Sequence, residues 1–136
     1  MEGIADAKVI GVGVVEATAA IGAEDFSRSV AFYTALLGRE PDHRIGDGHA
    51  EFRLPGLRLE IFRPRAGGAD DFRNPPGRRF GLGLVFRVSD LSRAVAEVER
   101  LGGAAAPAFD ASHGRECYAY DPDGNRLILV ERFAAQ

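Results

Sequence analysis

The chain has 136 residues, a formal net charge of −3 and 46% hydrophobic residues, which fits one globular domain with its own core. The negative charge argues against a broadly basic nucleic-acid-binding protein, and no apolar stretch reaches the roughly 20 residues of a membrane-spanning helix. The single cysteine, Cys117, excludes an internal disulfide and a cysteine-based zinc site, which favours a reducing, cytoplasmic setting. Together with the charge and the short apolar stretches, this predicts a cytoplasmic protein without nucleic-acid or membrane partners.

The first half of the chain reads as a strand, a helix and three short strands. An apolar run at 14–22 predicts the first strand, and the sequence DFSRSVAFYTALLG follows at 25–38. There Asp25 suits a helix N-cap, apolar residues recur at helical spacing, and Gly38 suits a left-handed helix end. The three later strands are expected at 41–45, 49–54 and 57–62.

The same order of elements returns in the second half. The sequence DLSRAVAEVERLGG at 90–103 repeats the first helix at an offset of 65, with Asp90 as N-cap and Gly103 at the helix end. Residues 80–88 precede this helix as an alternating strand, which indicates one buried face. A DPDGN sequence at 121–125 predicts a turn before the last strand. The later strands are expected at 106–110, 116–120 and 126–133.

In this order, these features resemble the vicinal oxygen chelate superfamily, which includes glyoxalase I, extradiol dioxygenases and the bleomycin- and fosfomycin-resistance proteins. The resemblance rests on the duplicated helix, its Phe32-Tyr33 and Leu37-Gly38 pairs and the DPDGN turn. It implies an α+β fold of two tandem βαβββ modules, which form a curved mixed sheet with the helices on its convex side. The chain, 1–136, is then a single glyoxalase/bleomycin-resistance-like domain, with module 1 at about 14–64, a linker at 65–79 and module 2 at about 80–133.

The resemblance also implies four positions for metal ligands, because members with chemistry mostly hold a divalent ion through His or Glu side chains. Here Thr18, Glu60, Gly83 and Ile128 occupy those positions. Glu60 alone is a strong donor, Thr18 is a weak one, and the other two side chains offer no donor atom. Catalytic metal sites have about three protein ligands, so no metal cofactor is expected, and a divalent metal is the alternative.

Strand alternation predicts a mixed polar and apolar surface on the face away from the helices. A two-residue turn at 55–56 would set Glu51 opposite Glu60 and His49 opposite Phe62. Like charges directly opposite destabilise a sheet, so something cationic should offset the two carboxylates. A salt-bridge network, a cationic ligand group and an unconventional His49/Glu51/Glu60 metal site are all open. The candidate ligand-binding residues are Thr18, His49, Glu51, Arg58, Glu60, Phe62, Arg87 and Ile128.

Three functions are compatible with these features. The preferred one is a metal-free small-molecule-binding protein that resembles the bleomycin-resistance members and holds a small, partly apolar or cationic ligand in the concave cavity. The alternative is a glyoxalase- or dioxygenase-like lyase, isomerase or dioxygenase, which is metal-dependent or uses Glu60, the only catalytic candidate, as an acid–base group. The third is a regulatory or assembly protein with a vestigial cavity.

The resemblance further implies a homodimer, because curved sheets of this kind often complete their cavities across a two-fold interface. An uncovered apolar patch on the concave face would be costly, which favours the same conclusion. Two other residues receive structural interpretations. Cys117 is expected to be a small buried residue, and His113 a solvated loop histidine.

Overall fold

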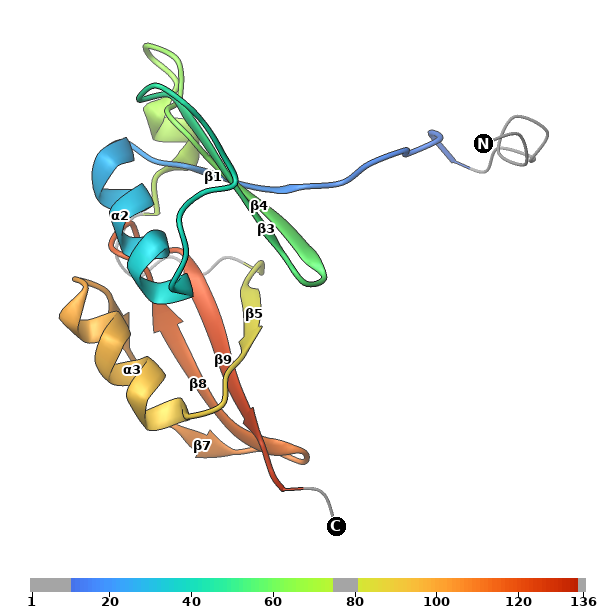
Figure 1. Ribbon diagram of the computed structural model, residues 1–136, viewed down its shortest axis with the longest axis vertical. Coiled ribbons are helices and arrows are strands. Elements are labelled where there is room, and N and C mark those ends of the chain that lie inside the picture. Colours follow the sequence, from blue (N-terminus) through green and yellow to red (C-terminus); the bar gives the residue numbers. More distant parts are fainter. Residues whose placement is uncertain (1–10, 75–80, 135–136) are drawn as a thin grey trace.

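A computed structural model describes residues 11–74 and 81–134. Predictions that fall on 1–10, 75–80 or 135–136, including the end of the linker and the start of the fifth strand, lie outside the described residues. Each half contains a strand, a helix and further strands, and both helices cover the same side of the strands (Figure 1). The α+β class with two similar modules is therefore confirmed. No helix in the described segments has the length and apolar character needed to cross a membrane.

The first half forms a four-stranded sheet in the order β1-β4-β3-β2. β1 (Ala19–Gly22) pairs in parallel with β4 (Leu57–Phe62), which forms an antiparallel hairpin with β3 (His49–Leu54), and β2 (His43–Ile45) lies at the edge. The hairpin has the predicted two-residue turn, with Gly56 at a φ of 79° that favours glycine. Its register also agrees with the prediction, because Glu51 lies opposite Glu60.

The first strand is shorter than expected, since β1 begins at Ala19 and the prediction began at residue 14. In the parallel pair Ala19 lies opposite Leu59, and β4 begins two residues earlier, at Leu57. β4 could therefore pair with the first strand back to residue 17 but no further. Residues 11–18 pair with no strand in the described part of the chain, and they extend away from the sheet on the side opposite the helices (Figure 1). Its three valines are largely exposed: Val12 (91%), Val14 (72%) and Val15 (95%).

The second half forms a sheet in the order β5-β9-β8-β6, and β7 also pairs with β8. β5 (Leu84–Arg87) lies parallel to β9 (Arg126–Arg132), which pairs in antiparallel fashion with β8 (Gly114–Tyr120). The strand predicted at 106–110 is confirmed only in part, because β7 (Phe109–Asp110) covers its end and a separate short strand, β6 (Ala104–Ala105), precedes it. The strand predicted at 80–88 is confirmed only in part. Leu82, which we expected to be buried in it, precedes β5 and is 86% exposed.

The two helices begin as the repeat predicted. In α2 (Phe26–Leu37) the Asp25 carboxylate accepts the backbone N–H of Arg28, and in α3 (Leu91–Arg100) Asp90 accepts that of Arg93, each over 3.1 Å. Gly38 ends α2 in the left-handed conformation, at a φ of 68°. The prediction for Gly103 was wrong, because the left-handed residue after α3 is Gly102, at a φ of 94°.

The hydrophobic core lies between the helices and the sheets. Alternate strand residues face it and are almost fully buried: Ala50, Phe52, Leu59, Ile61, Leu127 and Leu129. Phe26, Val30 and Tyr33 of α2 cover them. Because side chains alternate along a strand, the residues between these positions project to the open side of each sheet.

Polar contacts around the DPDGN turn connect the two halves. The Tyr33 hydroxyl donates to Oδ2 of Asp121 over 2.6 Å, and Arg28 pairs with Asp123 at the same distance. Burial, reinforced by the neighbouring Asp121, raises the pKa of Tyr33 well above 10.0. Burial and the Asp121 charge also raise the pKa of Asp123, although Arg28 opposes this shift. We name these four residues the inter-half clamp.

Candidate functional site

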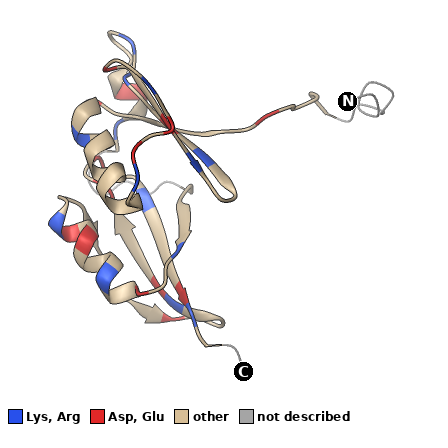
Figure 2. Cartoon of the chain, in the orientation of Figure 1, with Lys and Arg blue, Asp and Glu red and all other residues tan. Residues whose placement is uncertain are grey.

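The β3–β4 hairpin contains acidic and basic residues along its length (Figure 2), and its register places Glu51, Arg53, Arg58 and Glu60 on the open face of the first sheet. Glu51 is flanked by two arginines, with its oxygens 2.9 Å from Nε of Arg53 and 3.8 Å from Nε of Arg58. Arg58 also pairs with Glu16. The negative charge of Glu51 is therefore compensated by permanent cations, as a salt-bridge network requires.

Glu60, opposite Glu51, has a different environment. Its Oε1 lies 3.2 Å from Nε2 of His49, and among the described residues this histidine is its only ion-pairing partner. His49 lies directly opposite Phe62, so it reaches Glu60 across a diagonal of the hairpin. Because histidine carries a charge only when protonated, Glu60 forms no ion pair with a permanently charged side chain in the segments that the structure describes.

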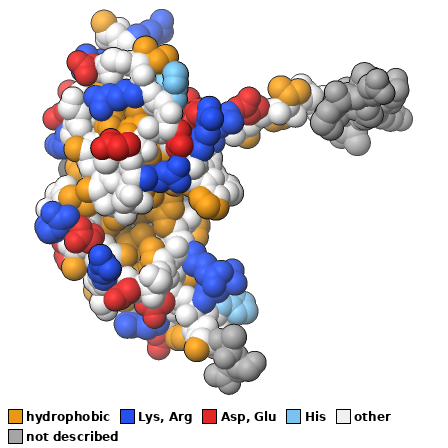
Figure 3. Space-filling model, in the orientation of Figure 1, with side chains coloured by type: hydrophobic (Ala, Val, Ile, Leu, Met, Phe, Trp, Pro, Cys, Tyr) orange, Lys and Arg blue, Asp and Glu red, His pale blue; other side chains and the backbone are white. Residues whose placement is uncertain are grey.

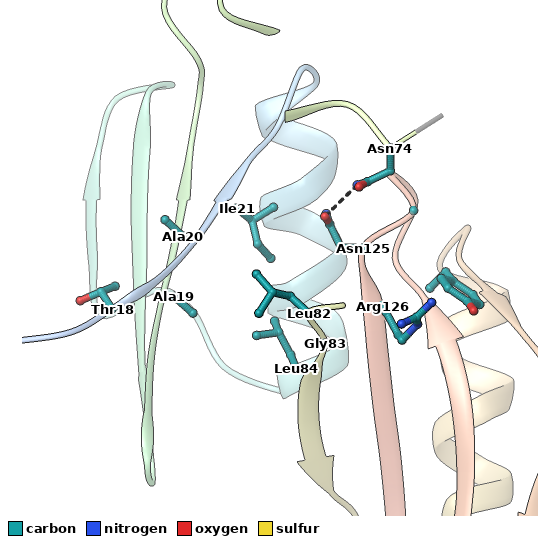
Figure 4. A pocket seen from close by; sticks show the side chains of 12 residues that line it. Thr18, Ala19, Ala20, Ile21, Asn74, Leu82, Gly83, Leu84, Asn125 and Arg126 are labelled. Carbon is teal, nitrogen blue, oxygen red and sulfur yellow. Dashed lines mark hydrogen bonds between the residues drawn. The ribbon is translucent and has the colours of Figure 1, made fainter. Parts of the chain in front are cut away.

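A second feature, a hollow of about 600 Å³, lies between the two sheets, where β1 and β5 each form the end of their own sheet. Figure 4 shows Ile21, Leu82 and Leu84 close together in this space. Asn74 and Asn125 lie at another side, joined by a 2.9 Å hydrogen bond. The full lining is Thr18, Ala19, Ala20, Ile21, Asn74, Leu82, Gly83, Leu84, Tyr120, Gly124, Asn125 and Arg126. Its volume and mostly apolar walls are typical of small-molecule sites.

Ala20 connects Glu60 to this hollow. It is the register partner of Glu60 across the β1–β4 pair, so the two side chains share the open face. Neighbouring strands lie about 4.8 Å apart. Ala20 also lines the hollow and is exposed, so a residue with a small side chain stands between Glu60 and the hollow.

The four positions that the sequence marked for metal ligands do not form a donor set. Thr18 and Gly83 line the hollow, whereas Glu60 lies in the first sheet and Ile128 in the second. A Cβ at Gly83 would stand 3.3 Å from Cδ1 of Ile128, so an aliphatic side chain occupies the space where a ligand would project. One carboxylate and one hydroxyl do not suffice for a divalent ion, and these residues do not fit a metal cofactor.

The unconventional metal site also finds no support. Within the described ranges, no group of three or more His, Cys, Asp or Glu side chains could hold an ion, and this includes His49, Glu51 and Glu60. Of the explanations for the paired carboxylates, the salt-bridge network accounts for Glu51. A cationic ligand group is still open for Glu60.

The remaining candidates lie around this centre or away from it. Phe62 packs edge-to-face against Phe72 of η1 (Ala69–Phe72), with ring centroids 5.0 Å apart. Arg87 is exposed at the end of β5, in the other sheet from Glu60. Cys117 is buried as predicted, and burial raises the pKa of its thiol. His113 is exposed in the loop before β8.

Sequence reasoning missed most of the hollow. Ala20, Leu82, Leu84, Asn74 and Arg126 were not candidates, because strand alternation describes faces within one sheet. The hollow lies between two sheets, and its position depends on how the halves meet. In the space-filling view, apolar side chains gather in the concave middle of the molecule, between the more charged regions at either end (Figure 3).

Comparisons with known proteins agree with this geometry. A family model for a glyoxalase-like domain matches residues 18–130. A glyoxalase-related enzyme from Fulvimarina pelagi has a similar structure, with a TM-score of 0.65, 22% identity, and coverage of 88% of this chain and 89% of that chain. A glyoxylase/bleomycin resistance protein/dioxygenase domain from Frankia sp. gives a TM-score of 0.68 at 23% identity, covering 95% and 96%.

A third structure contains a bound small molecule. The bleomycin-binding protein of Streptomyces verticillus, in complex with copper(II)-bleomycin, is similar with a TM-score of 0.56 and 24% identity, over 90% of this chain and 100% of that chain. At these identities the structural likeness shows the fold alone. No curated protein matches the chain.

Proposed function

Since this chain belongs to the glyoxalase-like family, we propose that it is a small-molecule-binding protein that holds a partly apolar or cationic ligand without a metal cofactor. The ligand occupies the hollow between β1 and β5 and contacts the open face of the first sheet at Glu60. The observation that carries this proposal is the position of Glu60. This carboxylate has no arginine partner among the described residues, and it adjoins the hollow through Ala20.

The donor set supports binding without a metal. Of the residues at the four family positions, Glu60 alone supplies a strong ligand, and its nearest ionic partner is His49. The other side chains at these positions are a hydroxyl, a hydrogen and a sec-butyl group. The bleomycin-binding structural neighbour supports a binding role within this fold, although it does not identify the ligand of this chain.

The pair formed by Glu60 and His49 favours a second candidate function, that of a lyase or isomerase that uses this pair for proton transfer. The 3.2 Å separation of Nε2 and Oε1 lets the carboxylate orient the imidazole, an arrangement that general acid–base catalysis uses. Turnover of a screened compound that Glu60→Gln abolishes while binding persists would favour this enzyme over the binding protein.

The proposal includes a homodimer in the cytoplasm. Val85 is 60% exposed and lies in the second sheet outside the lining of the hollow, so a second copy would cover apolar surface there. A reducing compartment suits the single free thiol, Cys117. Sedimentation equilibrium at micromolar concentration should give twice the chain mass, and a monomer alone would contradict the dimer.

A thermal-shift screen over aromatic amines, glycopeptide antibiotics and thiol conjugates tests the binding function. Each stabilising compound is then measured by calorimetry with three proteins: wild type, Glu60→Gln, and Glu97→Gln as a control on the helix side of the fold. Compounds that occupy the site should lose affinity with Glu60→Gln and keep it with Glu97→Gln. The proposal fails if no compound stabilises the protein, or if every hit is indifferent to Glu60.

A further inference from the structure

We propose that the ligand is an amphiphilic monocation, with an ammonium group at Glu60 and an apolar body that passes over Ala20 into the hollow. This inference rests on the proposed binding function and specifies the chemical class of the ligand. It depends on three arrangements: the charge balance around Glu60, the small residue beside it, and the change from apolar to polar lining across the hollow.

The arrangement of charges on the open face favours a cationic group at Glu60. Arg53 and Arg58 both contact Glu51, and Arg58 is further engaged by Glu16. These contacts leave Glu60 as the carboxylate of the hairpin without a permanent counter-charge in the described part of the chain. Its side chain is 29% exposed, so a ligand can reach it while much of the surrounding water is excluded. An anionic group placed beside Glu60 would be repelled by its carboxylate.

The residues of β1 direct the rest of the ligand away from Glu60. Ala20 stands beside Glu60 in the register, and Thr18 precedes it on the same open face. Both side chains are small and both line the hollow. The side chains that this segment places between Glu60 and the hollow therefore leave room for a body attached to the ammonium group.

The lining of the hollow determines what that body is. Near β1 and the start of β5, Ile21, Leu82 and Leu84 offer hydrocarbon contacts (Figure 4). Further along, the guanidinium of Arg126 brings a positive charge into the lining. The mostly apolar lining disfavours a second charged group on the body of the ligand, because burial of an unpaired charge among hydrocarbon side chains is costly. A ligand with one positive charge for Glu60 and a mostly hydrocarbon body for the hollow therefore matches the site.

Three probes that share one hydrocarbon body test this inference: 3-phenylpropylamine, 3-phenylpropan-1-ol and 3-phenylpropanoate. Calorimetry at pH 7.5 on the full chain should show the amine binding at least tenfold more tightly than the alcohol, because a charge-assisted hydrogen bond is about twice as strong as a neutral one. The carboxylate should bind more weakly than the alcohol. The tenfold ratio is the result that identifies a cation site.

Two variants then test whether Glu60 and Ala20 cause this ratio of amine to alcohol affinity. Glu60→Gln should reduce the preference for the amine to less than threefold and leave the alcohol affinity unchanged. Ala20→Phe should weaken the amine and the alcohol alike, because its ring would fill the path into the hollow. Glu97→Gln should reproduce wild type for all three probes, and circular dichroism establishes that each variant is folded.

The inference and the proposed function fail in different ways. If the alcohol binds as tightly as the amine, if Glu60→Gln preserves the tenfold preference, or if the amine does not bind at millimolar concentration, the ligand is not an amphiphilic cation. The proposed function survives these results if the broader screen yields a compound whose binding Glu60→Gln weakens. The proposed function and the inference are both overturned if no compound of the screen and none of the three probes binds.

Discussion

The hydroxyl of Tyr33 lies 2.6 Å from Oδ2 of Asp121, and this hydrogen bond joins a helix of the first half to the turn before the last strand of the second half. Asp121 accepts three further hydrogen bonds, from the backbone of Asp123 and from the backbone and side chain of Asn125. These bonds hold the turn that receives the Tyr33 hydroxyl, and the contact links the two halves. The hollow lies between those halves, so its shape depends on this buried pair.

Tyr33→Phe should destabilise the fold without altering its core volume. It removes a buried hydrogen bond to a charged group, and we expect the free energy of unfolding to fall by about 1 to 3 kcal/mol. Urea unfolding followed by circular dichroism measures this loss. Tyr118→Phe is the matched control, because Tyr118 is 40% exposed, and it should change the unfolding free energy by less than about 0.5 kcal/mol. Equal effects of the two substitutions would contradict the importance of the clamp.

Stability should fall at alkaline pH in a way that depends on Tyr33. Its folded-state pKa is raised well above 10.0, mainly by burial, so the native state keeps a proton that the unfolded state loses. The contribution of this group is complete below pH 10 and is lost as the pH rises above that value, at about 1.4 kcal/mol per pH unit. Unfolding free energies measured between pH 9 and 11 should decline more steeply for wild type than for Tyr33→Phe. Parallel declines would refute the assignment.

Gly103→Ala should be strongly destabilising. An added Cβ would overlap the backbone oxygen of Tyr120 and lie 2.8 Å from Cγ1 of Val98, and neither backbone nor buried core can yield cheaply. We expect a loss of about 2 kcal/mol or more. Gly48→Ala is the control, since its Cβ would meet nothing within 4 Å, and its melting temperature should stay within a few degrees of wild type. A stable Gly103→Ala variant would show that α3 and β8 are less closely packed.

Addition of Zn²⁺, Mn²⁺ or Fe²⁺ should leave the protein unchanged. The four family positions supply one strong donor, so we expect no saturable shift in melting temperature at an equimolar ion concentration and no retained metal after desalting. Glu60→Gln should give the same result as wild type. A single ion retained per chain and lost in Glu60→Gln would reverse this expectation and favour the metal-dependent enzyme.

Local sequence patterns correctly predicted the hairpin turn and the starts of the helices, because neighbouring residues determine both. The turn at Pro55 and Gly56 fixed the hairpin register, and Asp25 and Asp90 cap their helices as the repeat implied. Elements that need a partner elsewhere were less predictable. The apolar run before Ala19 is not a strand, because β4 turns back at Leu57 and leaves it no neighbour.

The candidate site shows the same division. The predicted two-residue turn correctly placed Glu51 and Glu60 opposite each other. It could not indicate that His49 reaches Glu60 diagonally, because that depends on side-chain conformation. Within the inter-half clamp, Tyr33 and Asp121 are 88 positions apart in the sequence, and no spacing rule predicts their contact. Whether the predicted ligand-binding residues contact a ligand is still a prediction.

The contact between Gly83 and Ile128 constrains how this site could change in evolution. Any side chain at position 83 would start 3.3 Å from a methyl group of Ile128, so a new histidine or glutamate there would be crowded from the outset. A histidine or glutamate at position 83 would be accommodated more easily beside a side chain smaller than isoleucine at position 128. The effects of substitutions at these two positions should therefore depend on each other.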